Sequence, residues 1–217
     1  MDTKRIIILE KNAKNNNFCI AGLTENGEWI RPISNNPEIE DAVPRESITF
    51  PDESELQLLD VVEVPIMENN PVNNPIQPEN FYYDDKIFWK KVGHMTLNKV
   101  TNLHGFDNRS KIFYNYDRSV DAEFVRRQPK RESLLLLPIK NLSVSVEIYN
   151  DHKKFFANFN YNGKNYQRFS VGDISVRERF KNFEEGEHFF KNRAVVLFSL
   201  TNPYKDGRCY KMVAQVF

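Results

Sequence analysis

Two Asn-Gly dipeptides, Asn26-Gly27 and Asn162-Gly163, constrain the fold of this chain more than any other feature. Each lies between two short runs that are rich in apolar and aromatic residues, as strands are. Asn-Gly favours a tight hairpin turn because both residues accept the positive φ that the turn requires. The sequence therefore predicts one β-hairpin over 18–34 and a second over 153–171.

Further short runs predict additional strands around these hairpins. They are expected over 4–11, 58–65, 133–138, 142–149, 194–200 and 209–216. Helices are expected over 119–127, before Gln128-Pro129, and over 175–185, where Asp173 is the predicted cap. The mixed charges of 180–193 are typical of a solvated helix. Many short strands with turn signals favour barrels or sandwiches.

The composition indicates a globular chain, because 40% of its 217 residues are hydrophobic and 13% are aromatic. No apolar run approaches the roughly 20 residues that cross a bilayer. The apolar run after Arg5 is too short for a secretory signal. Cys19 and Cys209 have no paired spacing, which indicates neither a disulfide framework nor a zinc site. We therefore expect a cytoplasmic protein without a membrane segment or cofactor.

The net charge of zero hides a strong segregation of charge. Between Asn35 and Asp85 the chain has 13 acidic residues and one basic residue, Arg45, a balance of −12. The remainder therefore carries +12, since the whole chain has 30 basic and 30 acidic residues. A basic surface attracts phosphate backbones, although ordinary solvated faces would show the same charges.

These patterns divide the chain into three parts. Residues 1–92 form an N-terminal domain with an acidic insertion over 35–57. Pro37, Pro44 and Pro51 punctuate this insertion, which we interpret as an excursion rather than a core element. Residues 93–132 form a connecting segment with a helical middle, and residues 133–217 form a C-terminal domain.

Several segments, taken in order, resemble a family of prokaryotic proteins described as dual OB-domain proteins. The segments are 4–11, 18–22, 28–32, 58–65, 77–80, 133–136, 159–166 and 209–214. At 171–174 the family tends to read Val-Thr-Asp-Pro, whereas this chain reads Val171-Gly172-Asp173-Ile174. The resemblance implies a mostly β chain of two small OB-like β-barrels, with long insertions and one or two short helices. It also implies nucleic-acid binding, often beside antiviral or mobile-element genes, and brings no established catalytic residues.

The first hairpin offers one candidate binding surface. A two-residue turn at Asn26-Gly27 would place Gly22 opposite Arg31, with Trp29 on the same face. An aromatic ring and a guanidinium over a glycine can stack a base and hold a phosphate. Alternatively, Trp29 covers a barrel end and Arg31 pairs with the acidic excursion.

The second hairpin interleaves basic and aromatic residues. Its turn would place Phe155, Ala157, Phe159 and Tyr161 on one face with Lys164, Tyr166 and Arg168. The other face would carry Asn158, Asn160, Asn165 and Gln167, followed by Phe156 paired with Phe169. The aromatic face suits a core, with its cations at the rim, or alternatively a stacking platform for bases.

A third candidate is the basic cluster Arg126, Arg127, Lys130 and Arg131, whose fixed charges can follow a phosphate backbone. Such clusters also occur on ordinary loops. The candidate nucleic-acid-binding residues are therefore Trp29, Arg31, Arg126, Arg127, Lys130, Arg131, Lys164, Tyr166 and Arg168.

Catalytic and metal-binding motifs are absent from the sequence. The four histidines lack partners at metal-ligand spacing, and neither a Gly-rich phosphate loop nor a Gly-x-Ser-x-Gly elbow occurs. We therefore expect a non-enzymatic nucleic-acid-binding module that prefers single strands and serves a defence or mobile-element system. The alternatives are a protein-interaction adaptor that uses the acidic segment 35–85, and a small-ligand domain that binds a nucleotide.

Overall fold

The computed structural model describes residues 2–14, 16–67, 72–106 and 109–217. The chain divides into two compact units. The N-terminal unit comprises residues 1–74 and 78–105, and the C-terminal unit comprises 75–77 and 106–217. The expected connecting segment 93–132 is thus shared, since its residues up to Gly105 belong to the N-terminal unit and the rest to the C-terminal unit.

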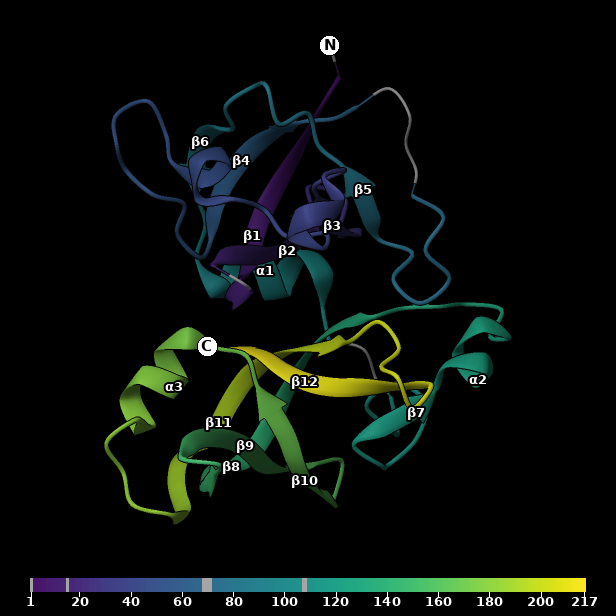
Figure 1. Cartoon of the computed structure of the whole chain (residues 1–217), viewed down its shortest axis with the longest axis vertical. Helices are drawn as coiled ribbons and strands as arrows, with labels where there is room; N and C mark the ends of the chain where they lie inside the picture. The colour runs from purple at the N-terminus through teal and green to yellow at the C-terminus, as the bar shows by residue number, and fades with distance from the viewer. Residues whose placement is uncertain (1, 15, 68–71, 107–108) are drawn as a thin grey trace. The chain divides into compact units, whose positions relative to one another are not determined.

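The N-terminal unit is built on a six-stranded sheet in the order β5-β3-β2-β1-β4-β6 (Figure 1). Its elements are β1 (Thr3–Lys14), β2 (Asn17–Thr24), β3 (Trp29–Ile33), η1 (Pro37–Ile39), η2 (Arg45–Ile48), β4 (Asp60–Pro65), β5 (Asn80–Tyr82), β6 (Lys90–His94) and α1 (Leu97–His104). β3 and β5 are parallel, and a bridge from Ile66 to Tyr83 links the ends of β4 and β5. The five strands β1 to β5 are therefore connected all the way round.

The acidic excursion 35–57 contributes to the core of this unit, so its interpretation as a segment outside the core is wrong. Val43, Ile48, Phe50 and Leu56 are buried in the same cluster as Ile6, Ile8 and the other inward residues of β1, β2 and β4. The prolines and acidic residues mark the exposed turns between these buried positions. The apolar residues among them pack against the inward residues of the sheet.

The C-terminal unit repeats the arrangement of the five strands β1 to β5, with the longer strand β8 in the place of β1. Its elements are β7 (Ser119–Asp121), α2 (Ala122–Arg126), β8 (Leu134–Tyr149), β9 (His152–Tyr161), β10 (Lys164–Val171), α3 (Ile174–Phe180), β11 (Gly186–Leu200) and β12 (Arg208–Val216). The order is β10-β9-β8-β11-β12-β7, and β10 also pairs in parallel with β12 (Figure 1). Strands β8 to β12 therefore close on one another, with α3 between the third and fourth strands.

Asp173 begins α3, as the sequence predicts. One carboxylate oxygen accepts hydrogen bonds from the Ser175 and Val176 amides, at 2.8 and 3.2 Å. The other accepts from Gln215 Nε2 at 2.6 Å and from the Val216 amide at 2.8 Å. Asp173 is 1% exposed, so one buried side chain caps the helix and holds the end of β12.

Three helix predictions need correction. The helix expected over 175–185 ends earlier, because α3 covers only Ile174–Phe180. The segment 180–193, expected as a solvated helix, contains the first half of β11, where Gly186 to Arg193 pair with β8. The mixed charge of this segment did not indicate that it pairs with β8. The helix expected over 119–127 is shorter, because residues 119–121 pair with β12 as β7 and α2 begins only at Ala122.

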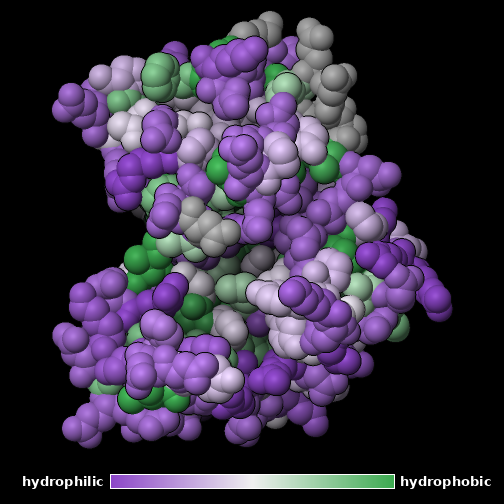
Figure 2. Space-filling model, viewed as in Figure 1, coloured by the Kyte–Doolittle hydropathy of each residue, from purple (hydrophilic) through white to green (hydrophobic). Residues whose placement is uncertain are grey.

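No helix in the described part of the chain is long and apolar enough to span a membrane. Figure 2 shows that hydrophilic residues cover most of the visible surface of both units, with hydrophobic residues in scattered groups. Scattered apolar residues are normal on a protein surface. The hydropathy of the visible surface therefore singles out no functional site.

Candidate nucleic-acid interface

The first hairpin has a different register from the predicted one. The Thr24 amide donates to the Glu28 carbonyl at 2.9 Å, and Leu23, not Thr24, lies opposite Trp29. The connection therefore has a three-residue loop ending at Gly27, whose φ is +77°. One extra loop residue shifts the strands by one position and moves side chains to the opposite face.

On β3, Ile30 points to the core, and Trp29 and Arg31 lie on the opposite face, where other parts of the chain cover them. Arg31 is 7% exposed, and its Nη2 lies 3.3 Å from Oε1 of Glu79. Trp29 packs edge-on against His104, with ring centroids 5.3 Å apart. The expected open space at Gly22 is also absent, because a Cβ there would lie 2.0 Å from the Ile7 carbonyl oxygen. These contacts fit the alternative in which Trp29 and Arg31 have structural roles. The partner of Arg31 is Glu79, however, which lies outside the 35–57 excursion.

The second hairpin follows the predicted register only over its first half. Lys164 lies opposite Tyr161 and Tyr166 opposite Phe159, but a bulge then places Phe169, not Arg168, next in the pairing. Arg168 adopts a φ of +60° in this bulge. The predicted pairing of Phe156 with Phe169 is therefore wrong: Phe169 is buried, whereas the Arg168 guanidinium lies 4.6 Å from the ring centroid of Phe156.

The aromatic face of this hairpin is a core, as the first of the two interpretations expects. Tyr166 is 1% exposed and stacks on Phe159 with ring centroids 5.5 Å apart. Its hydroxyl accepts a hydrogen bond from the Ile112 amide at 3.3 Å, and burial raises its pKa. Tyr166 is thus placed away from any surface ligand, whereas Lys164 is exposed beside the turn.

The opposite face of this sheet carries a row of polar and aromatic side chains. On β9, Phe155, Ala157 and Phe159 point inward, so the alternate residues between them point outward. We call the following set the outer row: Tyr149, Lys154, Phe156, Asn158 and Arg168.

Two cation–aromatic contacts organise the outer row. Nζ of Lys154 lies 4.6 Å from the centroid of the Tyr149 ring, which is 62% exposed. The Arg168 guanidinium covers Phe156 and forms an ion pair with Glu147 on β8. Asn158 accepts the Arg168 amide hydrogen at 2.9 Å. An exposed ring next to cations offers both stacking and charge to a nucleotide.

Of these residues, only Arg168 was a predicted site residue. The register expected from the sequence places Phe156 and Asn158 on the less aromatic face, and Tyr149 is not among the predicted site residues. Strand alternation carries the missing signal, because Lys154, Phe156 and Asn158 are spaced by two along β9. The bulge that brings Arg168 to this face has no such sequence signal.

The basic cluster lies apart from these strands in the fold. Arg126 and Arg127 end α2, and Lys130 and Arg131 follow in the next loop. All four side chains are exposed, and Arg126 forms an ion pair with Glu123. They remain possible phosphate contacts, but they do not extend the outer row along its strands.

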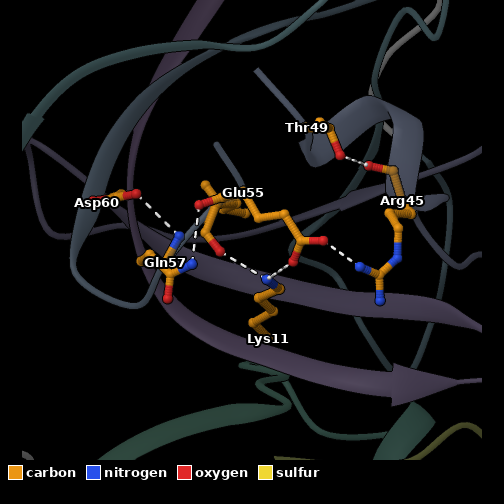
Figure 3. Close-up of polar contacts among 7 residues, drawn as sticks. Lys11, Arg45, Thr49, Glu55, Gln57 and Asp60 are labelled. Carbon is orange, nitrogen blue, oxygen red and sulfur yellow. Dashed lines mark hydrogen bonds and ion pairs between the residues drawn. The ribbon is translucent and has the colours of Figure 1, made fainter. Parts of the chain in front are cut away.

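The N-terminal unit has its own polar network, shown in Figure 3. Nζ of Lys11 on β1 lies 3.3 Å from Oε2 of Glu55 and 2.8 Å from the Leu56 carbonyl oxygen, while Arg45 pairs with Oε1 of Glu55. The hydrogen bond from Lys11 and the nearby Arg45 lower the pKa of Glu55. Part of the acidic excursion thus neutralises cations of its own unit.

The side chain of Asp60, at the edge of this network, is fully buried. Its carboxylate accepts the Gln57 amide at 3.0 Å and lies 2.7 Å from Nζ of Lys91 and 3.1 Å from Nδ1 of His94. Within the described residues, no three His, Cys, Asp or Glu side chains gather as a metal site would require. Cys19 and Cys209 are free thiols whose pKa values burial raises to about 11.

A family model described as a dual OB-containing domain matches residues 4–216. The chain therefore belongs to the dual OB-containing family. This match agrees with the two strand arrangements, each of five strands with parallel third and fifth strands. Comparisons with curated proteins and with solved structures found no match. The OB fold commonly binds oligonucleotides or oligosaccharides on the face of its second and third strands. In the C-terminal unit these strands are β9 and β10.

Proposed function

We propose that this dual OB-containing protein is a non-enzymatic nucleic-acid-binding module that prefers single strands. The outer row of the C-terminal unit is the proposed contact surface. The supporting observation is the pair of cation–aromatic contacts, Lys154 with Tyr149 and Arg168 with Phe156, on the second and third strands and the adjoining end of the first.

A single strand suits this surface better than a duplex. Bases in a single strand are free to stack on Tyr149, whereas bases in a duplex are already stacked on one another. Lys154 and Arg168 supply positive charge for the phosphates, and the Asn158 side chain holds the Arg168 backbone in place through its oxygen. The row therefore combines the two contacts on which single-strand binding depends. Service in a prokaryotic defence or mobile-element system, and a cytoplasmic location, remain parts of this proposal.

Fluorescence anisotropy with labelled single-stranded and duplex DNA and RNA, at low and moderate salt, tests the proposal. We expect single strands to bind more tightly than duplexes, and the affinity to fall as salt rises. Tyr149→Ala with Phe156→Ala should weaken binding by about 10- to 100-fold, since stacking contributes about 1–3 kcal/mol per base. Phe88→Ala is the matched control, because Phe88 is an exposed aromatic of the N-terminal unit.

The proposal fails if no single or double strand binds at low salt. Binding that the Tyr149 and Phe156 substitutions leave unchanged would place the contact surface elsewhere. In that case the cluster Arg126, Arg127, Lys130 and Arg131 is the next surface to test, by the same titration.

A further inference from the structure

A cavity of about 760 Å³ opens in the C-terminal unit where β8, β11 and the β9–β10 turn meet. Its lining includes Pro138, Lys140 and Asn160, with Arg193 and Val195 from β11. The volume is within the usual range for small-molecule sites, about 300–1,000 Å³. The lining combines an apolar floor with a few polar groups, as such sites do.

Two positive charges stand side by side in this cavity. Lys140 on β8 lies directly opposite Arg193 on β11, and Asn160 on β9 lies opposite Lys140 on its other side. Side chains of directly paired residues share one face of the sheet and are about 5 Å apart at their base. Like charges in such positions repel and destabilise the sheet unless an anion lies between them.

No aspartate or glutamate lines the cavity. Phe217, the last residue of the sequence, lines the cavity, but within the described residues its carboxylate forms no ion pair with Lys140 or Arg193. Within the described part of the chain, neither the Lys140 ammonium nor the Arg193 guanidinium has an ion pair or hydrogen bond. By contrast, Arg168 and Arg126 each have a glutamate partner. Two unpaired cations in a concave site are typical of anion recognition.

The cavity lies on the same face of β9 as the outer row. Asn160 follows Asn158 by two residues, and alternate residues of a strand point to the same side. Six residues separate Lys154 from Asn160, a span of about 20 Å along a strand. A strand of nucleic acid that follows the outer row would therefore reach this cavity.

The paired charges suit a terminal phosphate better than an internal one. An internal phosphate of a nucleic acid carries a single charge. A phosphate monoester at a strand end carries about −1.5 to −2 near pH 7, because its second pKa is about 6. Two adjacent cations therefore match a phosphomonoester, while Pro138 and Val195 can contact the attached nucleoside and Asn160 can hydrogen-bond to it.

We propose that this cavity binds a nucleotide with a terminal phosphomonoester, held between Lys140 and Arg193. The nucleotide is either the phosphorylated end of a strand that lies on the outer row or a free nucleoside monophosphate. The strand-end version rests on the function proposed above, whereas the free-nucleotide version does not.

The test compares three oligonucleotides of one sequence, with a 5′-phosphate, a 3′-phosphate or two hydroxyl ends, each labelled internally. We expect one phosphorylated form to bind the full chain about tenfold more tightly than the hydroxyl form, as charge-assisted hydrogen bonds do. The double variant Lys140→Gln/Arg193→Gln should lose this preference and bind the hydroxyl form within about twofold of the wild type. Lys86→Gln/Lys205→Gln removes the same charge from exposed turns outside the proposed surfaces and should keep the preference.

A second arm measures thermal shifts with a nucleoside monophosphate and with the matching nucleoside. A shift with the monophosphate alone, lost in Lys140→Gln/Arg193→Gln, supports the free-nucleotide version even if strands show no end preference. Lowering the pH through about 6 should weaken either preference, because the phosphate loses its second charge. A circular dichroism melt confirms that each variant is folded.

Two negative results have different meanings. Strands that bind equally well with and without terminal phosphate, together with no shift by the monophosphate, overturn this inference and leave the proposed function intact. Failure of every strand to bind refutes the proposed function and the strand-end version, and the thermal-shift arm then decides the cavity alone.

Discussion

The second and third strands of the two OB units present their arginines in opposite ways. In the N-terminal unit, Arg31 on β3 is buried and its partner Glu79 is buried with it. In the C-terminal unit, Arg168 on β10 is about half exposed, with a side-chain accessibility of 47%, and its partner Glu147 is 34% accessible. Each arginine has a glutamate partner, but only Arg168 can reach a ligand from where it lies.

This difference shows that the same local motif serves two purposes. Each hairpin has an Asn-Gly turn and an arginine on its second strand. Arg31 lies on the face of β3 opposite the core residue Ile30, where Glu79 covers it and the ion pair is part of the packing. The bulge before Phe169 turns Arg168 outward, where it covers Phe156. The arginine of the first hairpin is therefore part of the packing, and that of the second is exposed on the surface that we propose contacts the ligand.

The largest expected effect is on the stability of the C-terminal unit. Asp173→Ala should destabilise that unit by about 4 kcal/mol, since it removes a helix cap and leaves the Gln215 and Val216 donors without their acceptor. Chemical denaturation followed by hydrogen exchange measures the loss in each unit. Binding should fall with the fraction of folded C-terminal unit, while the N-terminal unit keeps its protection. Equal loss of protection in both units would contradict the separation of roles.

The next effect sharpens the contrast between the arginines. Arg31→Ala should cost about 3 kcal/mol of stability, because it leaves the Glu79 carboxylate buried without its cation. Replacing both partners, as Arg31→Met/Glu79→Met, should recover much of the loss, since a buried ion pair and an apolar pair often contribute similar stability. Urea denaturation measures both variants. A neutral Arg31→Ala variant would show that the pair is not structural.

Arg168→Gln should show the opposite pattern. Its stability should stay within about 0.5 kcal/mol of the wild type, as for other exposed ion pairs. Its affinity for a single strand should fall about fivefold, and the slope of log affinity against log salt should decrease by about one, as loss of one phosphate contact predicts. Anisotropy titrations over a salt series measure both quantities. A change in stability without a change in affinity would reverse the assignment made by the comparison.

The last prediction concerns a buried cation without counterpart in this comparison. Lys211 on β12 is 1% exposed, and its Nζ donates to the backbone and side-chain oxygens of Asn115, at 2.6 and 2.7 Å. Burial lowers its pKa from 10.5 to about 7. Between these two values the unfolded chain binds more protons than the folded chain, so stability should rise with pH above about 7.

Comparison with Lys211→Met isolates this contribution. Between pH 7 and 8.5 the denaturation midpoint of the wild type should rise relative to that of the variant, and below pH 7 the difference should level off. The range stops at 8.5 because the cysteine thiols of the unfolded chain titrate above it. Parallel pH profiles for the two proteins would exclude Lys211 as the titrating group.

The sequence alone determined the features that depend on neighbouring residues. The Asn-Gly dipeptides identified both hairpins, Asp173 identified the start of α3, and the alternation over 153–161 identified an aromatic core face. Together with the family resemblance, these signals predicted two OB-like units. Turn chemistry, capping and strand alternation act over a few residues, so they can be read without knowing the fold.

Only the tertiary structure decided which of these side chains are buried and which are exposed. Glu79, far away in the sequence, covers Arg31, and one bulge exposes Arg168 beside Phe156. Apolar residues of the acidic excursion joined the core because they pack against the inward residues of β1, β2 and β4, and Lys140 met Arg193 because β8 pairs with β11. Strand register and packing depend on partners far away in the chain, and a shift of a single residue exchanges the two faces of a strand.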